Sequence, residues 1–157
     1  MSTTSNQGLK LKLQRIIDTT PDELFDAWLS PDVLAQWFKP EAGFVWDDCQ
    51  INPTETGVFR FTLISDDKQH HHIITGHYID LDEPNMLSFT WSWELPQKGV
   101  RDTICSIIFS PISYHPDQTE LTVLHSGFAN QEIYDEHLKG WVNCLDALAA
   151  YFSSSKK

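Results

Sequence analysis

Two histidines are the side chains of this sequence best suited to carry chemistry. Leu121, Val123 and His125 alternate with polar neighbours, so His125 is expected to face the inside of a sheet. His137 and Trp141 stand four residues apart in a stretch with helical periodicity, so they are expected to share one helix face. An imidazole can serve as a polar anchor for a ligand or as a general base. The alternative is that both imidazoles are hydrogen-bonded within the core, as buried polar groups usually are.

Acid–base catalysis would need partners for these histidines. Tyr78, expected to face inward from another strand, is the third candidate acid or base. The inward positions of the expected strands contain no Asp or Glu, and no Gly-rich phosphate loop, Gly-x-Ser-x-Gly or His-Glu-x-x-His motif occurs. These absences argue against the commonest nucleotide-dependent, esterase and metalloprotease chemistries.

A run of three histidines, His70 to His72, raises the question of a metal site together with His77. Adjacent residues of a strand point to opposite faces, so at most His70 and His72 could act together. No Cys, Asp or Glu stands at ligand spacing among them. We therefore expect no metal and no other cofactor.

Composition limits the partners. The chain has 11 Lys and Arg against 22 Asp and Glu, which gives a net charge of −11. It contains no run of basic residues that would neutralise phosphates, so neither nucleic acid nor a membrane surface is expected as a partner. The sequence contains no stretch of about 18 apolar residues, the length needed to span a membrane. Cys49, Cys105 and Cys144 lie far apart without a Cys-x-x-Cys pair, which predicts free thiols in a reducing cytoplasm.

The elements that position these residues follow from periodicity. The 157 residues suit one domain, expected at 9–153 with flexible ends at 1–8 and 154–157. A strand is expected at 9–18, and about six more strands between residues 44 and 126, where apolar and polar residues alternate between turns. This alternation indicates an antiparallel sheet with one apolar face, because buried parallel strands read as continuous apolar runs.

Helices are expected before and after these strands. Thr20 can cap a short helix that begins with proline, with Glu23 completing a capping box, and Ser30 can cap a second in the same way. A long amphipathic helix is expected at 131–152. Gly140 lies in its middle at a cost of roughly 1 kcal/mol relative to alanine, which suggests that the backbone there approaches another segment closely.

Sheet and long helix each offer one apolar face, so they must pack together in an α+β domain. The inner face is rich in rings with few polar groups, which is typical of a small-molecule pocket but also of a solid core, and both interpretations remain open. At the end of the second helix, Trp37 and Phe38 either cover the mouth of a pocket or tie the helices to the sheet. The residues expected to contact a ligand are Trp37, Phe38, Phe59, Phe61, His72, Ile74, Tyr78, Phe89, Trp91, Trp93, Cys105, Ile107, His125, His137, Trp141 and Leu145.

Seven segments, in order along residues 10–152, carry a resemblance to a known family. They are Thr20–Trp28, Leu34–Pro40, Gly57–Phe61, Gly76–Asp80, Pro84–Trp91, Thr119–Phe128 and His137–Trp141, the last followed by Leu145 and Leu148. In these segments the chain resembles the START-like (helix-grip, SRPBCC or Bet v type) superfamily, and more closely its heat-shock-protein-90 ATPase activator homologue branch. The resemblance implies a curved antiparallel sheet wrapped around the C-terminal helix, two short helices after the first strand, and an apolar cavity between sheet and helix.

Three functions are compatible with this resemblance. The first is a single-domain binding module that holds a small apolar or aromatic ligand in the cavity. The second is an enzyme of the cyclase, hydratase or hydrolase type that uses His125, His137 or Tyr78 as acid or base. A chaperone partnership ranks below both, because an activator is expected to carry an additional docking domain. Monomer and homodimer both remain open.

Overall fold

The computed structural model describes residues 9–40, 42–94, 100 and 102–155 of the chain. The expected flexible N-terminus at 1–8 and the last two residues of the expected flexible C-terminus lie outside the described residues.

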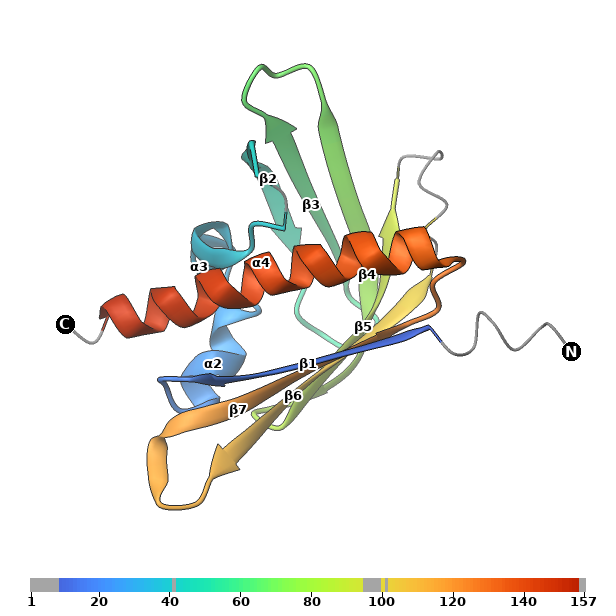
Figure 1. Ribbon diagram of the computed structural model, residues 1–157. Helices are drawn as coiled ribbons and strands as arrows, with labels where there is room; N and C mark the ends of the chain where they lie inside the picture. Colours follow the sequence, from blue (N-terminus) through green and yellow to red (C-terminus); the bar gives the residue numbers. More distant parts are fainter. Residues whose placement is uncertain (1–8, 41, 95–99, 101, 156–157) are drawn as a thin grey trace, which may run out of the picture.

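A seven-stranded antiparallel sheet and three helices make up the described part of the chain. The sheet has the strand order β1-β7-β6-β5-β4-β3-β2. The long helix α4 crosses its concave face, and α2 and α3 lie together at one end (Figure 1). This arrangement confirms the predicted α+β helix-grip fold. The elements are β1 (Lys10–Ile17), α2 (Pro21–Ala27), α3 (Pro31–Trp37), β2 (Phe44–Ile51), β3 (Val58–Ser65), β4 (His71–Asp82), β5 (Met86–Trp93), β6 (Thr103–Ile112), β7 (His115–Ser126) and α4 (Gln131–Ser155).

The two short helices begin where proline follows a hydroxyl residue, but their caps differ from the prediction. The Thr20 hydroxyl accepts a hydrogen bond from the Glu23 backbone N–H at 3.3 Å, as expected. The Glu23 carboxylate accepts from the hydroxyl of Thr19 at 2.6 Å and does not close a capping box. Ser30 makes no side-chain cap bond. The positions of both caps were therefore predicted correctly, whereas only one of the expected cap hydrogen bonds, that of Thr20, is present.

Helix α4 begins as the sequence predicts and ends at Ser155, beyond the expected Phe152. The Asn130 side chain caps it by accepting from the Ile133 backbone N–H at 3.0 Å. One stripe of the helix faces the sheet and is buried, with the side chains of His137, Trp141, Cys144, Leu145 and Leu148.

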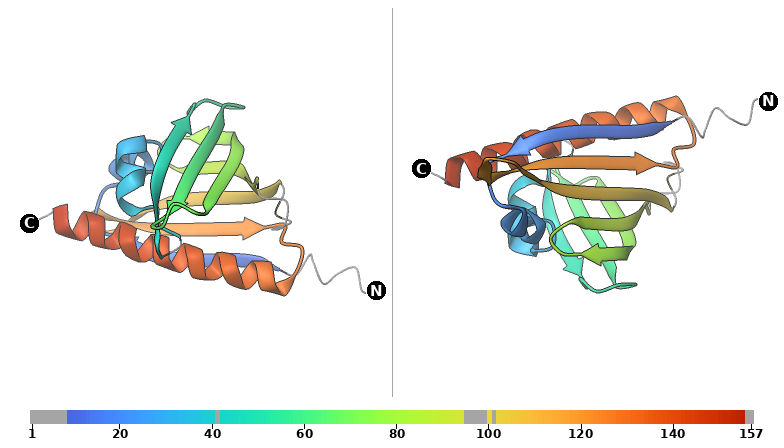
Figure 2. Two further views of the ribbon diagram at one scale, coloured as in Figure 1. Left: turned by 90° about the horizontal axis from the view of Figure 1, so that it is seen from above. Right: turned by 90° about the horizontal axis from the view of Figure 1, so that it is seen from below.

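The sheet curls around this stripe (Figure 2). The pairing register shifts between Trp46 and Asp48 of β2 and between Tyr78 and Asp80 of β4. Such irregularities bend a strand and increase its twist, which lets a sheet wrap around a helix.

Part of the inner face is a solid ring cluster. The Phe59 ring lies 4.9 Å from Phe61 and 5.5 Å from both Tyr78 and Phe89, centroid to centroid. A fifth ring, that of Trp28, stacks on Trp141 of α4 at a centroid distance of 6.0 Å. For this region the solid-core interpretation holds, because rings at these separations are in direct contact.

Trp37 ties the two short helices together. Its side chain is fully buried, its indole N–H donates to the Ala27 carbonyl at 3.1 Å, and its ring meets Trp28 edge-on at 4.7 Å. These contacts place Trp37 between the two short helices, and Trp37 is not among the described residues that line the larger of the two spaces between α4 and the sheet.

Candidate ligand-binding site

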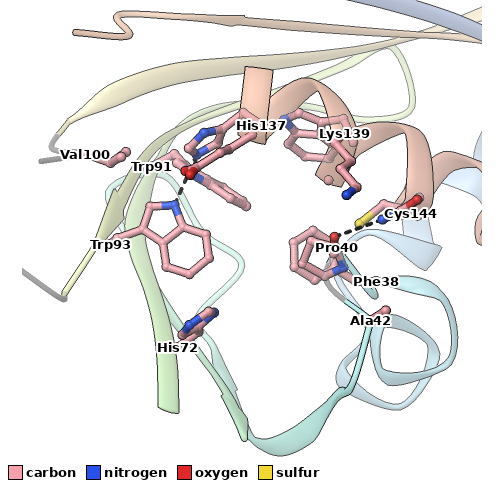
Figure 3. A pocket seen from close by; sticks show the side chains of 14 residues that line it. Phe38, Pro40, Ala42, His72, Trp91, Trp93, Val100, His137, Lys139 and Cys144 are labelled. Atoms are coloured by element: carbon pink, nitrogen blue, oxygen red, sulfur yellow. Dashed lines mark hydrogen bonds between the residues drawn. The ribbon is translucent and has the colours of Figure 1, made fainter. Parts of the chain in front are cut away.

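Two spaces between α4 and the sheet differ greatly in size. The outer pocket has a volume of about 370 Å³, whereas the inner void has about 20 Å³. An apolar cavity of about 150 Å³ binds benzene, and 20 Å³ is about the space of one water molecule. The outer pocket is lined by Phe38, Pro40, Ala42, His72, Trp91, Trp93, Val100, Glu136, His137, Lys139, Gly140, Trp141, Asn143 and Cys144 (Figure 3). The inner void is lined by Trp28, Leu34, Phe38, Phe59, Phe61, Tyr78, Leu87, Phe89, Trp91 and Trp141.

The walls of the outer pocket come mainly from strands β4 and β5, helix α4 and the segment that follows α3. Trp91 and Trp93 stand two residues apart on β5, so both face inward. His137 and Trp141 stand four apart on α4, which places them on the same helix face. In Figure 3, Trp93 and His72 lie on one side of the pocket, and Phe38 and Pro40 on the opposite side.

One nitrogen of His137 accepts hydrogen bonds from two indole rings. The ring N–H groups of Trp91 and Trp93 both donate to its Nε2, each at 3.1 Å. Its Nδ1 lies 2.9 Å from the carbonyl of Ile133, one helical turn earlier. This arrangement requires a neutral imidazole with its proton on Nδ1, donated to that carbonyl. The histidine thus fixes the orientation of both tryptophan rings.

His125 fixes a third indole. Its Nδ1 accepts from the Trp141 ring N–H at 3.0 Å, and its Nε2 lies 2.8 Å from the Thr103 hydroxyl. That hydroxyl donates to the Trp91 carbonyl at 2.7 Å, so His125 Nε2–H must be the donor to Thr103. Burial lowers the pKa of His125 well below its usual range. His125 is therefore neutral, with both nitrogens engaged.

Gly140 allows the segment between α3 and β2 to lie against α4. A Cβ built at this glycine would lie 3.4 Å from the Cβ of Pro40 and 3.6 Å from its carbonyl oxygen. One turn later, the Asn143 amide donates to that same carbonyl at 3.2 Å. The close approach that the mid-helix glycine predicts is found here, and it forms one wall of the outer pocket.

The three candidate acid–base residues do not meet in one space. His137 lines the outer pocket and Tyr78 the inner void, while His125 lines neither. Burial raises the pKa of the Tyr78 hydroxyl, which disfavours its ionised form. Among the described residues no Asp or Glu is buried. This geometry offers no assembled general base for the enzyme hypothesis.

The predicted ligand contacts fall into three groups. Phe38, His72, Trp91, Trp93, His137 and Trp141 line the outer pocket. Phe59, Phe61, Tyr78 and Phe89 line the inner void. Trp37, Ile74, Cys105, Ile107, His125 and Leu145 line neither and are buried in the core. Periodicity predicts that a side chain points inward, but it does not predict whether empty space lies next to that side chain. The three groups differ in that space.

Sequence reasoning missed eight residues that line the outer pocket. They are Pro40, Ala42, Val100, Glu136, Lys139, Gly140, Asn143 and Cys144. Five of them lie on α4 at the edge of the His137–Trp141 stripe, whereas the sequence placed the pocket beneath the stripe. Gly140 carried a usable signal, since the segment that it approaches had to form a neighbouring wall.

Charge is confined to the rim of the pocket. Within the described part of the chain, its charged lining residues are Glu136 and Lys139, and both side chains are exposed. The described residues contain no group of three or more His, Cys, Asp or Glu able to hold a metal ion. His72 instead stacks on Phe44 at 4.3 Å and meets Trp93 edge-on at 5.3 Å. None of the described helices combines the length and apolarity needed to cross a membrane.

Solved structures share this architecture. The AHSA1 protein from Silicibacter pomeroyi is 25% identical with a TM-score of 0.74, covering 93% of this chain and 99% of that one. The solution structure of an AHSA1-like protein from Aeromonas hydrophila is 17% identical with a TM-score of 0.77, covering 94% of both chains. A protein from Chromobacterium violaceum is 24% identical with a TM-score of 0.73, covering 91% of this chain and 96% of that one. No curated protein matches the sequence.

A family model locates the chain by sequence. The model described as Activator of Hsp90 ATPase homolog 1-like protein matches residues 18–153, which is most of the chain and includes every described helix and strand except β1 and the last two residues of α4. The chain therefore belongs to the Activator of Hsp90 ATPase homolog 1-like family, within the START-like helix-grip superfamily.

Proposed function

We propose that this protein is a cytoplasmic binding module that holds a small, flat apolar or aromatic molecule in the outer pocket. The observation that carries the proposal is a pocket of about 370 Å³ with four aromatic walls, Phe38, Trp91, Trp93 and Trp141. Ligand sites are typically about 300–1,000 Å³, mostly apolar, with a few placed polar groups. The three unpaired cysteines agree with a reducing compartment.

Rigid walls support the proposal further. The indoles of Trp91, Trp93 and Trp141 are held by two neutral histidines, so their rings are already oriented before a ligand arrives. Preorganised side chains lose little conformational entropy on binding, which favours affinity. Flat apolar ligands suit such walls because they can stack on, or meet edge-on, the ring surfaces.

The test is a fluorescence titration with the neutral apolar probe N-phenyl-1-naphthylamine. Saturable one-to-one binding is expected for the wild-type protein. Lys139→Trp puts a large ring at the rim of the pocket and should weaken binding at least about ten-fold, or roughly 1.4 kcal/mol. Lys12→Trp makes the same change at an exposed position of β1 and serves as the matched control.

Two outcomes would count against the proposal. One is the absence of saturable binding by the wild-type protein. The other is an equal loss of affinity in the Lys139→Trp and Lys12→Trp variants, which would mean that the probe binds elsewhere.

A further inference from the structure

A three-ring partition separates the outer pocket from the inner void. Of the residues that the structure describes, Phe38, Trp91 and Trp141 alone line both spaces. Their ring centroids lie 6.0 Å apart for Phe38–Trp91, 6.1 Å for Phe38–Trp141 and 5.5 Å for Trp91–Trp141. Each ring thus contacts the other two, and a ligand entering from outside meets this closed triangle.

Only two rings of the partition are tethered by hydrogen bonds of their side chains. Trp91 donates to His137 and Trp141 donates to His125. The Phe38 ring has no polar atom and is held by packing alone. The Phe38 backbone is fixed, because its N–H donates to the Leu34 carbonyl and its carbonyl accepts from Trp46, both at 2.8 Å. The Phe38 ring can therefore turn, or be removed, without breaking a hydrogen bond.

The packing of Phe38 also places it between the outer pocket and the inner void. On the inner side its ring meets Phe61 at 5.6 Å, and on the outer side it lies opposite Trp93 across the pocket (Figure 3). The inner void behind it measures about 20 Å³, which is too small for a ring or a chain of several methylenes. A ligand that reaches the partition therefore stops there.

We propose that Phe38 is the residue that sets the depth of the binding site and hence the length of ligand it accepts. The inference rests on the proposed function and adds to it a specificity: short or compact apolar molecules fit, whereas elongated ones leave their ends in solvent. Loss of the Phe38 ring joins the outer pocket to the inner void and shifts the preference toward longer molecules.

The experiment measures how a series of straight-chain primary alcohols, from butanol to dodecanol, displaces N-phenyl-1-naphthylamine. Each methylene that enters an apolar site strengthens binding about four-fold. For the wild-type protein, affinity should rise by this factor and then level off at the chain length whose end meets the partition. For Phe38→Ala the levelling-off should move to a longer alcohol, and for Phe38→Leu by less.

Two control variants separate depth from general loosening. Val100→Ala changes a buried residue that lines only the outer pocket, so it should affect all alcohols equally and leave the levelling-off point unchanged. Leu34→Ala enlarges only the inner void, so alone it should change nothing, but combined with Phe38→Ala it should extend the accepted length further. If Phe38→Ala does not fold, Phe38→Leu alone and with Leu34→Ala carries the same comparison.

An unchanged levelling-off point in the Phe38 variants, with wild-type binding intact, overturns the depth assignment and leaves the proposed function standing. Extension by Leu34→Ala alone overturns it as well. If the wild-type protein binds neither probe nor alcohol, the proposed function fails. In that case, long alcohols bound by Phe38→Ala would still support the assignment, and none bound would end it.

Discussion

The outer pocket and the inner ring cluster lie on the same sheet face and under the same helix, yet one is hollow and the other is filled. In the inner cluster the rings come from neighbouring strands and pack by contact alone. Phe59 lies directly over Gly76 of β4, where its ring atoms come within 2.7 Å of the position that a Cβ would occupy. The missing side chain lets the ring settle against the sheet, and the cluster closes around about 20 Å³.

In the outer pocket, hydrogen bonds hold the rings. The indole N–H groups of Trp91 and Trp93 must both reach His137, and a buried donor left without an acceptor is costly. The rings therefore cannot turn inward to fill the space. We infer that apolar composition alone does not decide between core and pocket, and that the hydrogen bonds of Trp91 and Trp93 to His137 help to keep the outer pocket open.

The largest expected effect tests the packing of the inner cluster. Phe61→Ala removes a buried ring that contacts Phe38, Trp46 and Phe59, and should lower the free energy of unfolding by about 3–5 kcal/mol. Phe44→Ala, the same change on a half-buried ring, should cost about 1 kcal/mol. Urea denaturation measures both. Equal losses would contradict the tight packing of the inner cluster around Phe61.

A smaller effect tests the hydrogen bonds behind the outer pocket. His125→Leu leaves the Trp141 N–H without its acceptor and should lower the free energy of unfolding by about 1–3 kcal/mol. Replacing both partners, His125→Leu with Trp141→Phe, removes the orphaned donor, so the double variant should lose less than the sum of the two single variants. Additive losses in a urea-denaturation cycle would show that the bond contributes little.

The same histidine predicts a pH dependence. Burial depresses the pKa of His125 in the folded protein, whereas in the unfolded chain it lies near its ordinary value of about 6.5. Below that pH the unfolded chain binds a proton that the folded protein does not. The free energy of unfolding therefore decreases as the pH is lowered, by up to about 1.4 kcal/mol per pH unit. Urea midpoints between pH 7.5 and 5 should show this loss, and His125→Leu should reduce the slope. An unchanged slope in the variant would exclude His125 as its source.

The smallest expected change in stability concerns Trp93, an aromatic wall of the outer pocket. Trp93→Leu removes one of two donors to His137, while Trp91 still donates, so stability should fall by about 1 kcal/mol or less. Binding of N-phenyl-1-naphthylamine should weaken by about ten-fold, because one aromatic wall is lost. A variant that loses stability but keeps its affinity would place the probe away from Trp93.

Much of the fold could be predicted from local pattern. Strict alternation along β3, β5 and β7 gave the correct inward faces, and the hydroxyl–proline pairs marked the starts of α2 and α3. Cap chemistry was less certain, because Thr19 competes for the carboxylate that a capping box would use. Such competition depends on the conformation of side chains, which local pattern does not contain.

The candidate site could be predicted only in part. Spacing along β5 and α4 identified Trp91, Trp93, His137 and Trp141 as inward-facing, and the outer pocket includes all four. Whether rings interlock depends on their rotamers and on distant contacts such as Phe59 over Gly76. These contacts join residues from different strands, so no single stretch of sequence shows which part of the face is filled.

The most direct test of the hollow outer pocket is a crystal structure of the protein soaked with 4-bromophenol, in which anomalous scattering locates the bromine. We predict a bromine peak between Trp93 and the wall formed by Phe38 and Pro40, with the inner rings unmoved. A peak among Phe59, Phe61 and Phe89, or no peak at a concentration that saturates binding in solution, would contradict the account.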